Sequence, residues 1–275
     1  MIRSPLRYPG GKSRAVEKIA ALIAPFDEFR EPFVGGGSVF IHLRQKFPRK
    51  KFWINDIYTD LAVFWQEIQS NSDLVIRQIW DWKSDFQNGK ELHKFLRENK
   101  SEFNRLRQAA AFFVFNRITF SGTTEAGGFS IQAFEKRFTD SSIERLAKMP
   151  EVLRDVKITN LDYEKVVNAD GENVFLFLDP PYFSATGSAL YGKNGNLHKT
   201  FDHERFAEAL RRCPHRWLLT YDDSPYVREL FSFANVADWN LMYGMRNITA
   251  NSSQKGSELF ISNYAPDELF AASGI

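Results

Sequence analysis

Residues 174–178 read Val-Phe-Leu-Phe-Leu, and Asp179-Pro180-Pro181-Tyr182 follow them directly. A continuous apolar run of this length is typical of a central parallel strand that is covered on both faces. In open α/β sheets, ligands bind at the carboxyl ends of such strands. We therefore expect Asp179, at the carboxyl end of a central strand, to lie in a ligand-binding site.

The two prolines restrict the backbone at this point. Each proline biases the residue before it toward an extended conformation, so Asp179 and Pro180 are both expected to be extended. The Asp179 carboxylate and the Pro180 carbonyl would then be two acceptors for the two hydrogens of an aromatic amine, and Tyr182 could stack on the ring. The alternative is a Pro-Pro turn that carries a surface aspartate and a packed tyrosine.

A glycine-rich turn lies near the start of the chain. Residues 31–40 read EPFVGGGSVF, between a strand predicted at 29–33 and a helix predicted at 38–46. Glycines at a strand-to-helix turn let a ligand approach the backbone closely. A plain tight turn remains the alternative for this segment taken alone.

Asp56 follows the next predicted strand, 51–55, and lies 19 residues after Gly37 (56 − 37). This spacing matches the acidic residue that binds ribose hydroxyls in nucleotide-binding α/β folds. Phe40 stands where the dinucleotide-binding pattern requires a third glycine. The sequence therefore favours a cofactor that has a ribose but no pyrophosphate, and it disfavours NAD.

The remaining periodicities predict one α/β domain with an insertion. Helical spacing is found at 14–23, 61–69, 74–82, 91–115, 203–212 and 225–231, and strand-like runs at 156–159, 216–221 and 258–264. No strong strand is expected between 61 and 150. We expect a catalytic domain formed by 1–60 and 151–275, interrupted by a mostly helical insertion at 61–150.

The composition is that of an ordinary globular enzyme, with 43% hydrophobic and 25% charged residues. The net charge of +2 does not indicate nucleic-acid binding by itself, so a DNA surface would require local clustering of basic residues. The single cysteine, Cys213, excludes an internal disulfide and fits a reducing compartment. The longest strongly apolar run, 109–115, is too short to cross a bilayer, and we expect a cytoplasmic protein.

Two other classes of site are disfavoured. Gly10-Gly11-Lys12-Ser13 resembles the end of a phosphate-binding loop, but that pattern requires a glycine where Leu6 stands and a strand before it. The five histidines are scattered without a ligand-like arrangement, so no metal is expected.

Taken together, the motifs resemble those of the DNA adenine methylase family. The matching segments, in family order, are YPGGK, EPFVGGGSVF, NDIYTDL, FNRITFSG, LDY, DPPYF and ELFISNY, spread from Tyr8 to Tyr264. The resemblance implies a Rossmann-like sheet of an S-adenosylmethionine-dependent methyltransferase with an inserted, mostly helical target-recognition domain. It implies methyl transfer from S-adenosylmethionine to the exocyclic N6 amine of a flipped adenine in duplex DNA.

The resemblance also implies residue roles. Tyr8, Pro9, Lys12, Phe33, Gly35 and Gly37 would line the methionine end of the cofactor, Asp56 would bind its ribose, and Asp162 and Tyr163 would hold its adenine. Asp179, Pro180, Pro181 and Tyr182 would be the catalytic group, with Asp179 contacting both substrates.

DNA contacts are expected from the insertion and from a late loop. By resemblance, Asn116, Arg117, Phe120, Ser121 and Glu125 would lie on DNA, with Phe120 as a wedge and Arg117 near a phosphate or a base. Lys193 and Lys199 belong to a Gly-, Ser- and Asn-rich loop at 184–200 that could order over DNA. Glu125 stands where GATC-specific relatives carry an arginine, and glutamate suits the cytosine amine better than guanine, which argues against GATC as the target.

Several alternatives stay open at this level. A methyltransferase acting on the cytosine N4 amine would use the same geometry, although Asp before Pro-Pro-Tyr favours adenine. A catalytically idle module that binds S-adenosylmethionine or DNA is a second alternative. The sequence does not indicate the oligomeric state, or whether the protein belongs to a restriction–modification pair, a phage or an orphan system.

Overall fold

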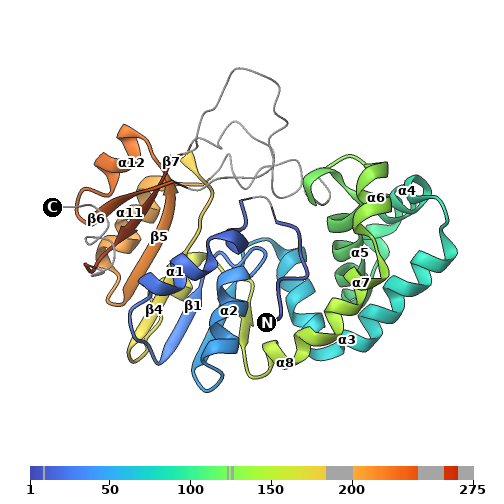
Figure 1. The fold of residues 1–275 in the computed structure, drawn as a ribbon, viewed down its shortest axis with the longest axis horizontal. Coiled ribbons are helices and arrows are strands. Elements are labelled where there is room, and N and C mark those ends of the chain that lie inside the picture. Colours follow the sequence, from blue (N-terminus) through green and yellow to red (C-terminus); the bar gives the residue numbers. More distant parts are fainter. Residues whose placement is uncertain (9, 123, 125–126, 184–200, 241–256, 266–275) are drawn as a thin grey trace.

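The computed structural model describes residues 1–8, 10–122, 124, 127–183, 201–240 and 257–265 (Figure 1). Seven strands form one sheet in the order β3-β2-β1-β4-β5-β7-β6. Their bounds are β1 Glu28–Glu31, β2 Lys51–Asn55, β3 Lys157–Thr159, β4 Val174–Leu178, β5 Arg216–Asp222, β6 Asn235–Asn240 and β7 Ser257–Ser262. The strands β1 to β5 pair in parallel, and β7 is antiparallel to both of its neighbours.

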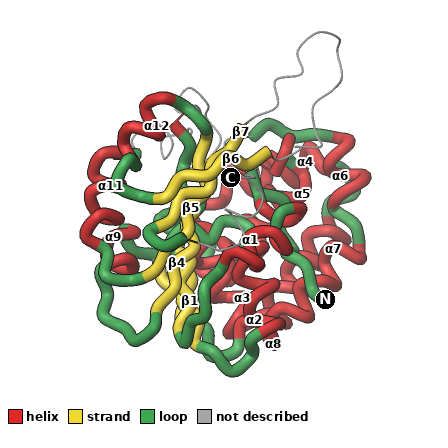
Figure 2. Tube along the Cα trace, turned by 60° about the vertical axis from the view of Figure 1, so that its left-hand side comes forward, coloured by secondary structure: helices red, strands yellow, loops and turns green. Residues whose placement is uncertain are grey.

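Helices cover both faces of this sheet (Figure 2). One face carries α9 (Tyr163–Val167), α11 (His203–Arg212) and α12 (Pro225–Leu230), and the other carries α1 (Val16–Leu22), α2 (Ser38–Lys46) and α3 (Thr59–Asp85). The strand β4 alternates between the two, because Phe175 and Phe177 join one hydrophobic core and Leu176 and Leu178 join the other. The predicted α/β fold class and the central buried strand are confirmed.

The helical part is built outward from α3 (Figure 1). It continues with α4 (Gly89–Asn99), α5 (Arg105–Ile118), α6 (Ile131–Arg137), α7 (Asp140–Glu144) and α8 (Met149–Leu153). Phe64 of α3 packs against Phe112 and Phe113 of α5, with ring centroids 5.5 and 6.4 Å apart. The helical part and one face of the sheet therefore belong to one continuous hydrophobic cluster.

Three elements differ from the sequence prediction. The helices predicted at 61–69 and 74–82 are one helix, α3, with a kink at Asn71, whose side chain donates to Glu67 at 2.8 Å. The single helix predicted at 91–115 is broken, and the side chain of Asn104 caps the start of α5 by accepting from Arg107 N at 2.9 Å. The edge strand β6 was not predicted, because its polar residues mask the alternation, although Trp239 packs face to face on Phe260 at 4.2 Å.

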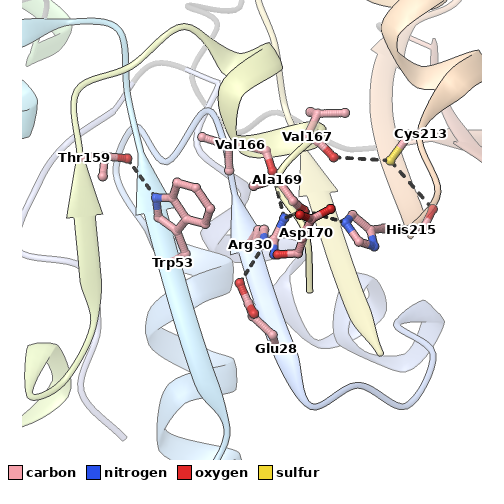
Figure 3. Close-up of polar contacts among 10 residues, drawn as sticks. All are labelled: Glu28, Arg30, Trp53, Thr159, Val166, Val167, Ala169, Asp170, Cys213 and His215. Atoms are coloured by element: carbon pink, nitrogen blue, oxygen red, sulfur yellow. Dashed lines mark hydrogen bonds and ion pairs between the residues drawn. The ribbon is translucent and has the colours of Figure 1, made fainter. Parts of the chain in front are cut away.

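A buried arginine fixes the segment that connects α9 to β4 (Figure 3). Arg30 of β1 is 1% exposed, and its guanidinium pairs with Glu28 at 2.6 Å and stacks over Trp53. It also donates to three carbonyls, that of Val166 in α9 (3.0 Å) and those of Ala169 (2.6 Å) and Asp170 (2.8 Å) in the connecting segment. This segment leads from α9 to β4, which Asp179 follows directly, so Arg30 helps to hold two walls of the site described below.

His215 and Cys213 contact the same segment. A ring nitrogen of His215 lies 2.8 Å from the Ala169 carbonyl, and the Cys213 thiol lies 3.7 Å from that of Val167 (Figure 3). Burial raises the pKa of the Cys213 thiol, as expected for a small core residue and not for a nucleophile. Among the described residues, no helix has the length and apolar character needed to span a membrane.

Candidate active site

A cavity of about 390 Å³ opens at the carboxyl ends of β1, β2 and β4. The strand order reverses between β1 and β4, and ligands of open α/β sheets bind at such a switch point. The structure brings twelve of the predicted site residues together around this cavity: Tyr8, Lys12, Phe33, Gly35, Gly37, Asp56, Asp162, Tyr163, Asp179, Pro180, Pro181 and Tyr182. Pro9 lies outside the described residues.

The glycine turn forms the floor of the cavity. Gly35 and Gly37 have φ angles of +46° and +65°, in the left-handed region that favours glycine. Tyr8 packs directly on the turn, because a Cβ placed on Gly35 would lie 2.7 Å from the Tyr8 ring. Trp65 donates to the Gly35 carbonyl at 3.2 Å from the side of α3. The turn is thus clamped between the N-terminal segment and the first inserted helix.

Two buried carboxyl groups hold the ends of this turn. Glu31, 3% exposed, accepts from the backbone N–H of Phe40 at 2.9 Å and satisfies a free donor in the first turn of α2. Asp56 accepts from Gly35 N and Tyr58 N, each at 3.0 Å. Burial raises the pKa of Asp56 to about 6 and that of Glu31 well above its ordinary value. Each carboxylate oxygen can accept a second bond, so Asp56 can still receive hydroxyl donors from the cavity.

An aromatic wall closes the side formed by α9. Tyr163 packs against Phe33, Phe201 and Phe206, with ring centroids 5.5, 5.8 and 5.3 Å apart. Asp162, the residue before it, caps α9 by accepting from Glu164 N at 2.9 Å. Arg205 of α11 pairs with Asp162 at 3.1 Å and with Glu164 at 2.8 Å, a contact that the sequence did not indicate.

The residues after β4 form the opposite wall. The Asp179 Oδ1 atom accepts from the Thr220 hydroxyl at 2.7 Å and lies 2.8 Å from the Lys12 ammonium. The Tyr182 ring stacks on Tyr221, with centroids 5.8 Å apart and planes 17° apart, and its hydroxyl accepts from Lys12 at 2.8 Å. Asp179 therefore lines the same cavity as the glycine turn, held by groups from two distant parts of the chain.

Glu258, at the start of β7, was not singled out in the sequence. It is 2% exposed, and burial is the first cause that raises its pKa to about 7. The charges of Asp179 and Asp222 raise this pKa further, whereas the charge of Lys12 and a hydrogen bond with Tyr182 lower it. The antiparallel register places Glu258 opposite Asp222 at the end of β5, so its position beside the site follows from a pairing that the sequence alone does not give.

The residues expected to contact DNA differ in their exposure in the structure. Asn116 is 0% exposed and Arg117 is 5% exposed. Asn116 accepts from Arg7 N at 2.9 Å and donates to Arg7 O at 2.6 Å, and Arg117 donates to the Pro5 carbonyl. These two residues therefore fasten the N-terminal segment to α5, and in this conformation neither presents its side chain to DNA.

Phe120, by contrast, is 72% exposed at the end of α5. Ser121 lies in the same short 3-10 turn, Phe120–Gly122. Glu125, Lys193 and Lys199 lie outside the described residues, as does the loop at 184–200. Among the described residues, no group of three or more His, Cys, Asp or Glu side chains is arranged to hold a metal ion.

The sheet order and the position of the cavity define a Rossmann-like fold with a ligand site at its switch point. Residues 8–245 match the family described as D12 class N6 adenine-specific DNA methyltransferase, and the chain belongs to this family. The protein therefore transfers a methyl group from S-adenosylmethionine to the N6 amine of adenine in DNA. The family decides for adenine against the alternative of the cytosine amine.

Similar proteins carry names of the same kind. The chain is 26% identical to the type II methyltransferase M.MjaIII of Methanocaldococcus jannaschii over 199 residues, 64% of this chain and 68% of the relative. It is 26% identical to a DNA N-6-adenine-methyltransferase of Escherichia phage P1 over 238 residues, 83% of this chain but 31% of the relative. It is also 26% identical to a DNA adenine methylase of Vibrio cholerae over 264 residues, 91% of each chain.

Proposed function

We propose that this enzyme methylates an adenine that has left the stack of a specific duplex site, and that the predicted residues divide the cavity between cofactor and base. The observation that carries this proposal is the position of Asp179. Its carboxylate lines the same cavity as Gly35, Gly37 and Asp56, so one residue can face both substrates. The Pro180 carbonyl, next in the chain, is the second acceptor for the amine.

The cofactor half of the cavity fits S-adenosylmethionine. Bound there, the cofactor supplies a methyl group that its positive sulfur makes electrophilic. The glycine turn allows close backbone approach, Asp56 offers acceptors for ribose hydroxyls, and the ring of Tyr163 provides an apolar wall for an adenine. Asp162 and Phe33 lie beside that wall and complete the adenine subsite in this proposal.

The half of the cavity proposed for the target adenine needs hydrogen-bond acceptors and correct alignment more than a strong proton acceptor. The oxygen Oδ1 of Asp179 is held by Lys12 and Thr220, which leaves Oδ2 for the target amine. Holding both amine hydrogens, on Asp179 and Pro180, localises the nitrogen lone pair toward the cofactor. Tyr182, stacked on Tyr221, offers a ring face to the base.

Access to the amine requires that the base leave the helix, at a cost of a few kcal/mol. Phe120 has the exposure expected of a side chain that fills the space left in the stack. We assign duplex recognition to the helical segment 61–150, with Ser121 and Glu125 near the bases and Lys193 and Lys199 near phosphates. Glu125 remains the reason to expect a target other than GATC.

Two exposed arginines, Arg137 and Arg145, lie near the buried Arg117 and support a DNA-facing surface on the helical segment. Burial and the charges of Arg145, Arg7 and Arg137 lower the pKa of Arg117 to about 9. Arg137 and Arg145 are exposed, and within the described part of the chain no ion pair joins any of the four to a carboxylate. Uncompensated positive charge of this kind favours a DNA phosphate.

Transfer of a tritium-labelled methyl group to DNA, followed by nucleoside analysis by mass, tests this proposal. We expect N6-methyladenine from the wild type and no measurable product from Asp179→Ala. The matched control is Asp81→Asn, which changes an exposed carboxylate on α3 and should keep full activity. Normal turnover in Asp179→Ala would overturn the catalytic assignment, and a labelled product other than N6-methyladenine would overturn the chemistry of the site.

A further inference from the structure

We infer that Lys12 is a positioning residue for the catalytic carboxylate and not a ligand of the cofactor. This inference rests on the proposed role of Asp179 and differs from the cofactor role that the family resemblance implied for Lys12. It is carried by the contacts of one buried ammonium group. Lys12 is 3% exposed and begins a short 3-10 helix, Lys12–Arg14.

The ammonium group of Lys12 has three close partners within the protein. It forms an ion pair with Asp179, 2.8 Å from Oδ1, and it donates hydrogen bonds to the Tyr182 hydroxyl at 2.8 Å and to the Gly10 carbonyl at 3.0 Å. An ammonium group has three donors and no acceptor, so these partners equal its donors in number. A cofactor carboxylate would have to compete with them for the ammonium group.

The burial of Lys12 explains why its partner must be a carboxylate. A buried ammonium ion costs several kcal/mol unless it is paired and hydrogen-bonded. Asp179 is the side chain that forms an ion pair with it in the described structure, and Asp179 itself is 22% exposed toward the cavity. Lys12 is therefore paired with the carboxylate that is proposed to face the target base.

Lys12 and Thr220 act on the same oxygen from different directions. Lys12 comes from the N-terminal segment and Thr220 from β5, the strand next to β4. Thr220 is 0% exposed and its hydroxyl donates to Asp179 Oδ1 at 2.7 Å. These two contacts on one oxygen restrict rotation of the carboxylate before any substrate binds, and they leave Oδ2 for the target amine.

Restricting this rotation matters because methyl transfer depends on alignment. A misplacement of a reacting group by 1 Å can cost about 100-fold in rate. The same ammonium also donates to the Tyr182 hydroxyl, so loss of Lys12 would loosen both the acceptor and the ring proposed to receive the base. The N-terminal YPGGK motif thus acts on the chemical step through Asp179 and Tyr182.

Two measurements on Lys12→Met separate positioning from cofactor binding. We expect its single-turnover methyl-transfer rate, at saturating cofactor and DNA, to fall by about 100-fold. We expect its Kd for S-adenosylhomocysteine, measured by calorimetry, to stay at the wild-type value. The matched control is Lys18→Met, which changes an exposed lysine of α1 that lies over Trp239, and it should change neither quantity.

A second pair of variants tests the same oxygen if Lys12→Met does not fold. Thr220→Val removes the hydroxyl at nearly constant shape and should lower the transfer rate by about tenfold, the loss expected for a hydrogen bond to a charged group. Thr220→Ser keeps the hydroxyl and should restore most of that rate. Neither variant should change the affinity for S-adenosylhomocysteine.

The opposite pattern would overturn the inference. A Lys12→Met protein with a weakened Kd and a normal transfer rate at saturating cofactor would make Lys12 a cofactor ligand. Equal rates in Thr220→Val and Thr220→Ser would show that the donors on Oδ1 do not matter. A wild type that transfers no methyl group to adenine would instead refute the proposed function, so the two failures are distinguishable.

Discussion

The buried carboxyl of Asp56 makes cofactor affinity depend on pH. Its pKa is raised to about 6, so it is ionised at neutral pH and protonated in mild acid. The ionised form offers acceptors to ribose hydroxyls, whereas protonation removes the charge and turns one oxygen into a donor. If only the ionised form binds, the apparent Kd grows by about tenfold between about pH 7 and about pH 5, which is about 1.4 kcal/mol.

Calorimetric titration with S-adenosylhomocysteine at constant ionic strength measures this dependence. Asp56→Asn should bind about tenfold to hundredfold more weakly at neutral pH, because a hydrogen bond to a charged group is lost, and its Kd should be flat over the same pH range. Glu258→Gln should keep the wild-type slope, because Glu258 titrates near Asp179 and not near the ribose. A flat wild-type profile, or a slope that persists in Asp56→Asn, would refute the reasoning.

Other parts of the molecule give further expectations. Arg30→Met leaves three carbonyls without their donor and should lower the free energy of unfolding by about 3–5 kcal/mol in urea denaturation; a loss near zero would show that Arg30 is not a structural anchor. The Glu258 carboxyl, with its pKa near 7, carries its negative charge only above that pH, so the single-turnover rate should rise with pH through about 7 in the wild type and lose this rise in Glu258→Gln. If Arg137 contacts a DNA phosphate, Arg137→Gln should reduce the magnitude of the slope of the log binding constant against log salt by about 0.9. The control is Arg154→Gln, at the exposed residue that follows α8, which should leave the slope unchanged. Equal slopes in the two variants would remove Arg137 from the DNA surface.

The elements that the sequence predicts well are those whose residues carry their own signal. The apolar run at 174–178 needs both faces covered, and the structure covers both. The strand 51–55 and the helix 38–46 have the predicted bounds, because Asp56 and the glycines mark their ends. The cavity gathers the predicted residues for the same reason, since carboxyl ends of parallel strands meet at one edge.

What the sequence could not show depends on contacts between distant segments. Asn116 and Arg117 look like polar residues ready for DNA, but their partners, Arg7 and Pro5, lie more than a hundred positions away. The pairing of Lys12 with Asp179 has the same character, as does the approach of Glu258 through an antiparallel edge. Local periodicity does not encode such pairs, because they arise only when the sheet order is known.

The shared hydrophobic cluster of α3 and α5 bears on how target specificity can be redesigned. Phe64 of α3 packs against Phe112 and Phe113 of α5, and all three belong to the hydrophobic cluster that also contains residues of the sheet, so the helical part shares its core with the layer beside the glycine turn. A graft that replaced the whole of 61–150 would also replace Trp65, whose indole donates to the Gly35 carbonyl. Chimeras between related enzymes should therefore keep the helices of the host and exchange only the short turn beyond Ile118.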